Sequence, residues 1–251
     1  MLNEDIMIDF TGKHVLVTGA AGGIGYKAAE QMLKAGATVI LADLNAAALN
    51  KAAAALDPEG KRSSLKQVDV SSPASVAELF ASLKQEYGGL DHLVHCAGMY
   101  PNVMTAECSD ETWKRVISVN LDGTFYLCRD ALSLLREGSS IVLCASMAGH
   151  KGSFCHSGYA ATKGGTLAFM HSIAMEYAPK VRVNCVSPGI ISTGMTEDLI
   201  DERGKALLAS TPLRRFGEPD EVASVILFLC SPLASFITGE TIHINGGMFM
   251  D

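Results

Sequence analysis

The stretch SGYAATKGG, residues 157–165, places a tyrosine and a lysine four positions apart. In a helix this spacing puts Tyr159 and Lys163 on one face, one turn apart. A free phenol has a pKa near about 10, too high for an efficient base near neutrality, and a neighbouring ammonium group favours the phenolate. Taken alone, such a pair is more often solvated surface than active site. It becomes a candidate proton-transfer centre if other groups meet it.

Two further polar residues precede this pair. Ser146 ends the apolar, strand-like run SSIVLCAS, and Asn120 lies in the helical pattern VISVNLDG. Removing a hydride from a secondary alcohol also requires removing its hydroxyl proton, and a serine hydroxyl can stabilise charge that develops on that oxygen. A serine at a strand end can equally cap a turn. With Tyr159 at a suitable distance along the chain, Ser146 becomes a candidate substrate contact.

A glycine-rich turn follows the first strand-like run, HVLVTG. Gly19, Gly23 and Gly25 fall where the chain must turn sharply and approach a diphosphate at a helix N-terminus, with Gly22 and Ile24 between them. Free N–H groups and the helix dipole favour anions there. Turns favour glycine in any protein, so the motif alone is weak evidence. Its position between a strand and a helix is the context that a dinucleotide site requires.

The second strand-like run, TVILAD, ends in a carboxylate. Asp43 stands roughly 20 residues beyond the glycine turn, where it can accept both adenosine ribose hydroxyls and repel a 2′-phosphate. It can also start the following helix, and the two roles can coexist. The turn holds Ala20 and Ala21, and Leu44 follows the aspartate, so no basic residue recruits a phosphate. The sequence predicts NAD(H) over NADP(H).

Together these residues resemble the short-chain dehydrogenase/reductase family. Gly19, Gly23 and Gly25 match its T-G-x-x-x-G-x-G turn, and the likeness extends through SPG at residues 187–189 to the terminal ITGETIHINGG. Its catalytic tetrad matches four residues: Asn120, Ser146, Tyr159 and Lys163. The resemblance implies hydride transfer between NAD(H) and a secondary alcohol or ketone.

The resemblance also implies a role for each residue of the tetrad. Tyr159 exchanges the proton, and Ser146 binds the substrate oxygen. Lys163 holds the nicotinamide ribose and, with the positively charged nicotinamide, lowers the pKa of the phenol. Asn120 holds a water that passes the proton outwards. Further cofactor contacts are implied after the third, fourth and sixth strands: Asp69, Val70, Ala97, Gly98, Pro188, Gly189, Ile191 and Thr193.

Three positions depart from the family pattern. His95 and Cys96 replace the two asparagines of its N-N-A-G motif, so we expect other hydrogen bonds to support this strand. Asn245 replaces an aspartate, and nothing in the sequence explains this replacement.

Asp69 has an alternative role, because it can cap the helix that follows the third strand. Ser72 is the other candidate for this cap.

Three loops are expected to form the substrate wall: residues 98–103, residues 150–156 and the insert after Thr193. His150 and His156 in this wall have the appearance of ordinary loop histidines, and a hydroxyl-binding role for His156 is the alternative. Ser146, Tyr159 and His156 are therefore the candidate substrate residues. Cys155 is a candidate accessible thiol.

Short β-branched runs alternate with longer helical patterns along the chain. Residues 109–135 predict one long helix and residues 159–177 another. The alternation predicts an α/β fold: a single domain, residues 1–251, with a Rossmann-type, doubly wound parallel sheet of about seven strands and helices on both faces. The irregular residues 190–218 are predicted to form a substrate lid.

Composition excludes several classes of protein. The net charge is −7 without a cluster of lysine and arginine, which argues against nucleic acid or membrane partners. The start MLNEDIMIDF lacks the features of a signal peptide, and no apolar run reaches the ~20 residues that span a bilayer. Seven scattered cysteines without C-x-x-C spacing predict free thiols in a reducing cytoplasm, and the seven histidines form no metal-ligand pattern.

The assembly expected from the resemblance is a homotetramer. Leu167, Met170 and Ala174 form a stripe suited to pairing, with a core-facing stripe as the alternative, and the tail Met248, Phe249 and Met250 is expected to pack on a neighbouring subunit. The favoured substrate is a sugar, polyol or other small hydroxy compound. The alternatives are a 3-oxoacyl-thioester of acyl carrier protein and, in another class, a catalytically silent NAD-sensing protein.

Overall fold

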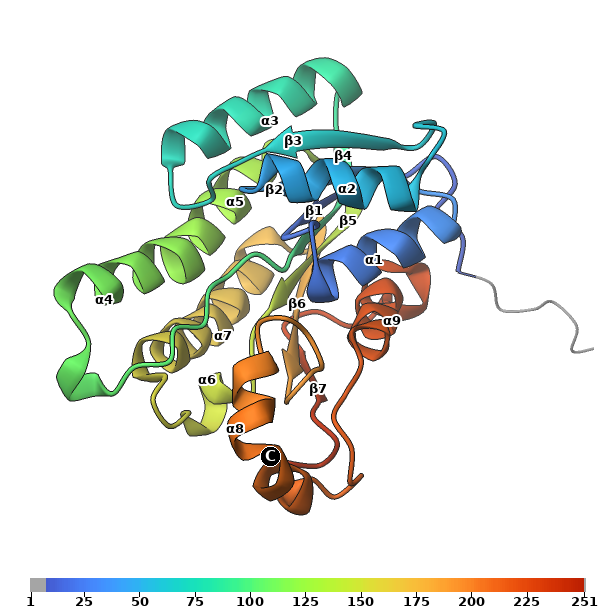
Figure 1. Ribbon diagram of the computed structural model, residues 1–251. Coiled ribbons are helices and arrows are strands. Elements are labelled where there is room, and N and C mark those ends of the chain that lie inside the picture. The colour runs from blue at the N-terminus through green and yellow to red at the C-terminus, as the bar shows by residue number, and fades with distance from the viewer. Residues whose placement is uncertain (1–7, 251) are drawn as a thin grey trace, which may run out of the picture.

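The structure is a computed structural model, and it describes residues 8–250. Residues 1–7, which begin the acidic start discussed above, lie outside the described residues. Seven strands form one sheet in the order β3-β2-β1-β4-β5-β6-β7, and each adjacent pair is parallel (Figure 1). The strands are β1 (His14–Thr18), β2 (Thr38–Asp43), β3 (Ser63–Gln67), β4 (Leu90–His95), β5 (Leu135–Cys144), β6 (Val181–Pro188) and β7 (Thr241–Ile244). The predicted fold class is confirmed.

Helices cover both faces of the sheet. They are α1 (Gly23–Lys34), α2 (Ala46–Leu56), α3 (Pro73–Tyr87), α4 (Asp110–Ile117), α5 (Gly123–Ala131), α6 (Ala148–Lys151), α7 (Ser157–Tyr177), α8 (Glu197–Ser210) and α9 (Pro219–Cys230), with short segments η1 (Thr105–Glu107), η2 (Ser118–Asp122) and η3 (Pro232–Ala234). Among residues 8–250, no helix combines the length and the apolar character needed to cross a membrane.

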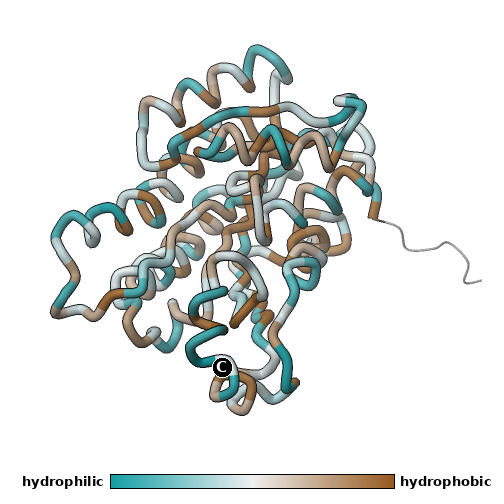
Figure 2. The backbone as a smooth tube through the Cα atoms, in the orientation of Figure 1, coloured by the Kyte–Doolittle hydropathy of each residue, from teal (hydrophilic) through white to brown (hydrophobic). Residues whose placement is uncertain are grey.

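Alternation along the strands divides the hydrophobic core into two layers. Leu16 faces the layer that α3, α5 and α7 cover, whereas Val15 and Val17 face the layer beneath α1, α2 and α9. Successive strand residues point to opposite faces, so a fully buried parallel strand is apolar on both sides. Figure 2 shows these hydrophobic residues along the strands in the middle of the molecule. The two packed layers hold the carboxyl ends of the strands in a fixed arrangement.

The long helix expected over residues 109–135 is interrupted. α4 ends at Ile117, the π-helical segment η2 follows, α5 ends at Ala131, and β5 already begins at Leu135. A π turn inserts a residue into the helical period and commonly occurs at functional sites. Here it carries Asn120, whose side chain is buried. The prediction of one continuous helix is wrong because hydrophobic periodicity does not reveal a single inserted residue.

The apolar stripe of α7 faces the core rather than a partner. Met170 and Ala174 are 0% and 4% exposed, and Leu167 packs against the same core layer. The pairing role predicted for this stripe is therefore wrong, and its core-facing alternative is confirmed. The homotetramer itself stays a prediction.

Candidate active site

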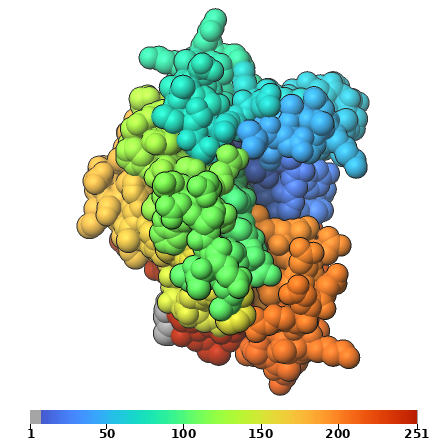
Figure 3. Space-filling view, turned by 60° about the vertical axis from the view of Figure 1, so that its left-hand side comes forward, coloured from blue at the N-terminus to red at the C-terminus, as the bar shows by residue number. Residues whose placement is uncertain are grey.

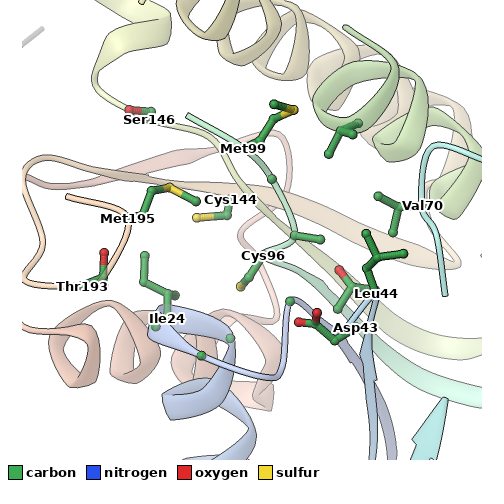
Figure 4. A pocket seen from close by; sticks show the side chains of 18 of the residues that line it. Ile24, Asp43, Leu44, Val70, Cys96, Met99, Cys144, Ser146, Thr193 and Met195 are labelled. Atoms are coloured by element: carbon green, nitrogen blue, oxygen red, sulfur yellow. The ribbon is translucent and has the colours of Figure 1, made fainter. Parts of the chain in front are cut away.

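A pocket of about 660 Å³ opens at the carboxyl ends of the strands. Figure 4 shows Asp43 and Leu44 towards one end and Ser146 towards the other, with Cys96 and Cys144 between them. In the space-filling view, the green segment that carries α4 and the orange segment that carries α8 lie on two sides of the molecule's hollowed face (Figure 3). In open parallel sheets, ligands bind beyond these strand ends.

The pocket gathers most of the predicted site. Its lining includes the predicted cofactor residues other than Asn120, together with Ser146: Gly19, Gly22, Gly23, Ile24, Gly25, Asp43, Leu44, Asp69, Val70, Ala97, Gly98, Tyr159, Lys163, Pro188, Gly189, Ile191 and Thr193. Asn120 lies directly behind the wall, where its amide oxygen is close to Gly98. Among the lining residues that were not predicted from the sequence are Arg115 of α4 and Val119, which directly precedes Asn120 in η2. Arg115 and Val119 are four residues apart, which puts them on one helical face, and this spacing was an available signal.

Two glycines of the turn, Gly19 and Gly25, have no room for side chains. A Cβ added to Gly19, where φ is +70°, would lie 2.7 Å from the backbone nitrogen of Ala97, and one added to Gly25 would lie 2.2 Å from the carbonyl oxygen of Gly19. α1 begins directly after Gly22, which provides no side-chain cap. The first-turn N–H groups of the helix are thus suited to an anionic ligand, and the turn fits a dinucleotide diphosphate.

Asp43 connects the glycine turn to the start of α2. Its carboxylate accepts hydrogen bonds from the backbone nitrogens of Ala21, at 3.2 Å, and Asn45, at 3.1 Å. Its structural and ligand-binding roles are compatible, because a carboxylate has about four lone-pair sites. Of the described residues that line the pocket, Arg115 and Lys163 carry the positive charges, and neither comes from the glycine turn or the end of β2.

His95 provides the support that the altered family motif requires. Thr18 Oγ1 lies 2.7 Å from His95 Nδ1, His95 Nε2 lies 3.0 Å from Thr124 Oγ1, and Thr124 Oγ1 donates to the Asn120 carbonyl at 2.7 Å. Because the Thr124 proton is used, Nε2–H is the donor to Thr124, and Nδ1 accepts from Thr18. Burial, with a smaller effect of the Lys163 charge, lowers the pKa of His95 to about 3. The ring is therefore neutral and links β1, β4 and the π turn.

The buried amide of Asn120 fixes the chain after β4. Its Oδ1 accepts from the Met99 backbone nitrogen at 2.8 Å, and its Nδ2 donates to the Met99 carbonyl at 2.9 Å and to Thr162 Oγ1 at 3.3 Å. This side chain holds Met99 at the pocket wall. The predicted water relay through Asn120 stays a prediction.

Tyr159, Lys163 and Ser146 meet at the end of the pocket opposite Asp43. Lys163 is 7% exposed, and its Nζ donates to the Cys144 carbonyl at 2.6 Å and lies 5.6 Å from the centre of the Tyr159 ring. The predicted proximity of these two side chains is therefore present. Ser146 Oγ accepts from the Ala148 backbone nitrogen at 3.1 Å, which orients the hydroxyl.

Burial is the main influence on the pKa of Tyr159 in the structure. Burial raises the pKa of this phenol above its ordinary value, because the anion loses hydration, while a hydrogen bond with Ser146 opposes the shift. Among the described residues burial is the largest cause, and the lowering expected from Lys163 together with the nicotinamide stays a prediction. The group is a phenol at neutral pH, and it can donate a proton.

His156 lies behind the substrate end rather than on the pocket wall. Its ring is 4% exposed and stacks on Tyr100 at 3.8 Å between centroids, while Tyr100 meets Tyr159 edge-on at 4.7 Å. His156 Nδ1 lies 2.6 Å from the Phe154 carbonyl, which it reaches as an N–H donor. Burial lowers the pKa of His156. A direct contact of His156 with substrate stays a prediction, whereas its contact with Tyr100 is present.

The side chain of Asn245 forms hydrogen bonds with the C-terminal tail that follows it. Asn245 Oδ1 accepts from the Gly247 backbone nitrogen, and Nδ2 donates to the Phe249 carbonyl, each at 2.9 Å. An aspartate lacks the donor for the second bond. Phe249 packs on its own chain against His150 and His243, at 5.0 and 5.3 Å between ring centroids. Packing of the tail on a neighbouring subunit stays a prediction. Met250 is 76% exposed.

The insert of residues 190–218 borders the pocket through its first part. Thr193, Met195 and Thr196 contribute to the lining, and Thr196 Oγ1 donates to the Ile191 carbonyl at 2.5 Å. α8 follows and has no buried residue. A helix so weakly packed is suited to movement, and its role as a lid stays a prediction. Residues 8–250 contain no group of three or more histidine, cysteine or acidic side chains that could hold a metal ion.

Comparison with known proteins gives a consistent family. The model of a family described as enoyl-(acyl carrier protein) reductase matches residues 19–249. 3-Oxoacyl-[acyl-carrier-protein] reductase FabG of Aquifex aeolicus is 38% identical over 246 residues, which cover 96% of this chain and 99% of that protein. The protein of the same name from Escherichia coli K12 is 36% identical over 246 residues, covering 97% and 100%.

A solved structure is similar over a comparable length. A crystal structure from Brucella melitensis, described as a short-chain dehydrogenase/reductase of the glucose/ribitol dehydrogenase type, has a TM-score of 0.95 and 45% sequence identity. The alignment covers 98% of this chain and 100% of that one.

Proposed function

The chain belongs to the short-chain dehydrogenase/reductase family, and we propose that it uses NADH to reduce the ketone of a 3-oxoacyl thioester. Membership makes it a nicotinamide-dependent oxidoreductase. The thioester substrate was the alternative in the sequence analysis. The relatives from Aquifex aeolicus and Escherichia coli, whose names state this reaction, favour it over a sugar or polyol.

The observation that carries the proposal is the meeting of Tyr159, Ser146 and Lys163 at the inner end of the pocket. Burial holds its pKa above the ordinary value, so at neutral pH it can give its proton to a ketone oxygen that becomes an alkoxide. The Ser146 hydroxyl shares a hydrogen bond with this phenol and would hold the same oxygen. Bound NADH would supply the hydride, and Lys163 would hold its ribose.

The apolar side chains at this end of the pocket favour an acyl chain as the substrate. Met99 and Met195 line the pocket and present thioether and hydrocarbon surface (Figure 4). A polyol would need a hydrogen-bonding partner for each buried hydroxyl, since an unpaired buried polar group costs about 1–3 kcal/mol. His156, for which hydroxyl binding was the alternative role, stacks on Tyr100 and uses its Nδ1 on the Phe154 carbonyl.

The preference for NADH is supported by the adenosine end. A 2′-phosphate would lie near the Asp43 carboxylate, and neither the glycine turn nor the first residues after β2 offer a cation. Arg214 and Arg215 are adjacent in the sequence, but they offer a carrier protein little free charge, because Arg215 is bonded to Glu221 at 2.6 and 2.7 Å. We therefore propose the thioester as the substrate class without assigning its carrier.

The test compares cofactors and substrates in one assay. NADH or NADPH is offered with acetoacetyl-coenzyme A, and NAD with a panel of sugars and polyols, while absorbance of the reduced nicotinamide is followed. We expect turnover of the thioester, with kcat/KM at least about tenfold higher for NADH than for NADPH. The variant Asp43→Ala should reduce that ratio.

Other outcomes identify the alternatives. Turnover confined to sugars or polyols would support the second candidate, which the description of the Brucella melitensis structure favours. Tight NADH binding without turnover across the panel would indicate a nucleotide-sensing protein. A preference for NADPH would contradict the role given to Asp43.

A further inference from the structure

Two cysteines lie next to each other in the pocket, between the glycine turn and the Tyr159–Lys163 pair. His95 of β4 pairs with Leu143 of β5 in parallel register, so the following residues, Cys96 and Cys144, are also neighbours. Adjacent strands lie about 4.8 Å apart, within the Cα separations of about 4.4–6.8 Å that a disulfide bridges. Both cysteines line the pocket (Figure 4).

The two thiols are neighbours, and both belong to the pocket lining. The interaction between them lowers the pKa of Cys144 and raises that of Cys96. Burial opposes ionisation of Cys144, and the positive charge of Lys163 favours it. Both residues are half-buried, whereas Cys128, Cys185 and Cys230 are buried in the core. The thiolate is the reactive form of cysteine, so this pair has a nucleophile and a partner in place.

We propose that Cys96 and Cys144 form a reversible disulfide that weakens binding of nicotinamide dinucleotide in this pocket. The oxidant is a peroxide. The Cys144 thiolate attacks one oxygen of hydrogen peroxide, the O–O bond breaks, and a sulfenic acid and hydroxide form. The Cys96 thiol then attacks that sulfur, the S–S bond forms, and water leaves. Two thiols are oxidised and one peroxide is reduced to two waters, and a dithiol reductant reverses the bond.

The surroundings of the pair explain why a bridge would affect the cofactor. A Cβ added to Gly19 would lie 2.9 Å from the Cys96 carbonyl carbon, so the glycine turn packs directly on this backbone. The Cys144 carbonyl accepts the hydrogen bond of Lys163 at 2.6 Å. Drawing the two side chains together therefore displaces backbone that supports both the diphosphate turn and the ribose-binding lysine. Bound dinucleotide should in turn cover the thiols. This inference rests on the proposed function only in taking NADH as the ligand.

The experiment uses the full-length, reduced protein. It is treated with hydrogen peroxide, with and without excess NADH, digested without reduction, and analysed by mass spectrometry for linked peptides. NADH affinity is measured by fluorescence titration before oxidation, after oxidation and after dithiothreitol. We expect a Cys96–Cys144 linkage that NADH slows, NADH affinity reduced by about tenfold or more, and full recovery on reduction.

Matched variants distinguish the effect of the disulfide on NADH affinity from the effect of oxidation elsewhere in the protein. Cys96→Ser and Cys144→Ser should each retain NADH affinity under peroxide far better than wild type, whereas Cys108→Ser, which removes a half-buried thiol outside the pocket, should behave like wild type. Absence of the linked peptides in wild type would overturn the inference, as would a linkage that leaves NADH affinity unchanged. If reduced wild type bound no NADH, the proposed function would fail instead, because the linkage is mapped independently of the ligand.

Discussion

The two ends of the pocket are built in different ways. At the adenosine and diphosphate end, strand termini and glycines determine the surface, and an added methyl at Gly19 or Gly25 would meet backbone atoms within 3 Å. At the substrate end, side chains from separate loops form the wall, among them Met99 and Met195. The first end is a rigid cradle that fits one class of ligand. At the substrate end, substitution of the wall residues can change which ligand binds, and in this way one fold serves many reactions.

The largest expected effect concerns Tyr159, at the substrate end of the pocket. Tyr159→Phe removes the proton donor but keeps the ring that packs on Tyr100, so turnover should fall about 10³-fold while NADH affinity changes little. Steady-state kinetics and fluorescence titration measure the two quantities. Tyr126→Phe, on α5 and outside the pocket lining, is the control. Turnover within tenfold of wild type would remove Tyr159 from the mechanism.

The rigidity of the cradle can be tested within the glycine turn. Gly19→Ala places a methyl 2.7 Å from a backbone nitrogen in a backbone conformation that disfavours side chains, so NADH affinity should fall about 100-fold. At Gly22 the φ angle is −169° and an added methyl meets nothing within 4 Å. Gly22→Ala should therefore weaken binding much less. Equal losses for both variants would show that the turn tolerates displacement and is no rigid cradle.

His95, which links β1, β4 and the π turn, should make the free energy of unfolding depend on pH. His95 has a pKa of about 3 when folded and an ordinary value near 6.5, so the folded protein binds fewer protons than the unfolded chain between these values. The resulting stability is complete above about pH 6.5 and is lost as pH falls. His95 alone should lower the free energy of unfolding by about 2 kcal/mol between pH 7 and pH 5.

Urea unfolding of wild type and His95→Gln at these two pH values measures the effect. His92, whose pKa burial lowers to about 4, remains in both proteins and contributes equally. The variant should be less stable than wild type at pH 7, because Thr18 and Thr124 lose a well-placed partner, yet lose about 2 kcal/mol less on acidification. The same pH dependence in both proteins would show that folding leaves the pKa of His95 unchanged.

The same contrast separates what the sequence predicts from what it does not. Some parts of the site are local sequence patterns at the ends of strands and helices: the glycine turn, Asp43 and the Tyr159–Lys163 spacing. Their positions in the fold could therefore be predicted from the sequence. The π turn at Asn120 was missed because one inserted residue leaves the hydrophobic pattern intact. The Thr18–His95–Thr124 contacts join residues far apart in the chain. Hydrogen bonds of this kind follow from tertiary packing, and periodicity carries no information about them.

The smallest expected effect concerns the substrate end. Tyr100 stands between His156, on which it stacks, and Tyr159, which it meets edge-on, so it positions the proton donor without being a proton donor itself. Aromatic pairs of this kind contribute about 0.5–1.5 kcal/mol beyond area burial. Tyr100→Leu should raise KM for the carbonyl substrate about threefold to tenfold and leave NADH affinity unchanged, whereas Tyr100→Phe, which keeps both ring contacts, should restore the wild-type KM. A parallel loss of NADH affinity in Tyr100→Leu would mean that the two ends of the pocket are coupled, and the separation drawn between the rigid cradle and the variable wall would not hold.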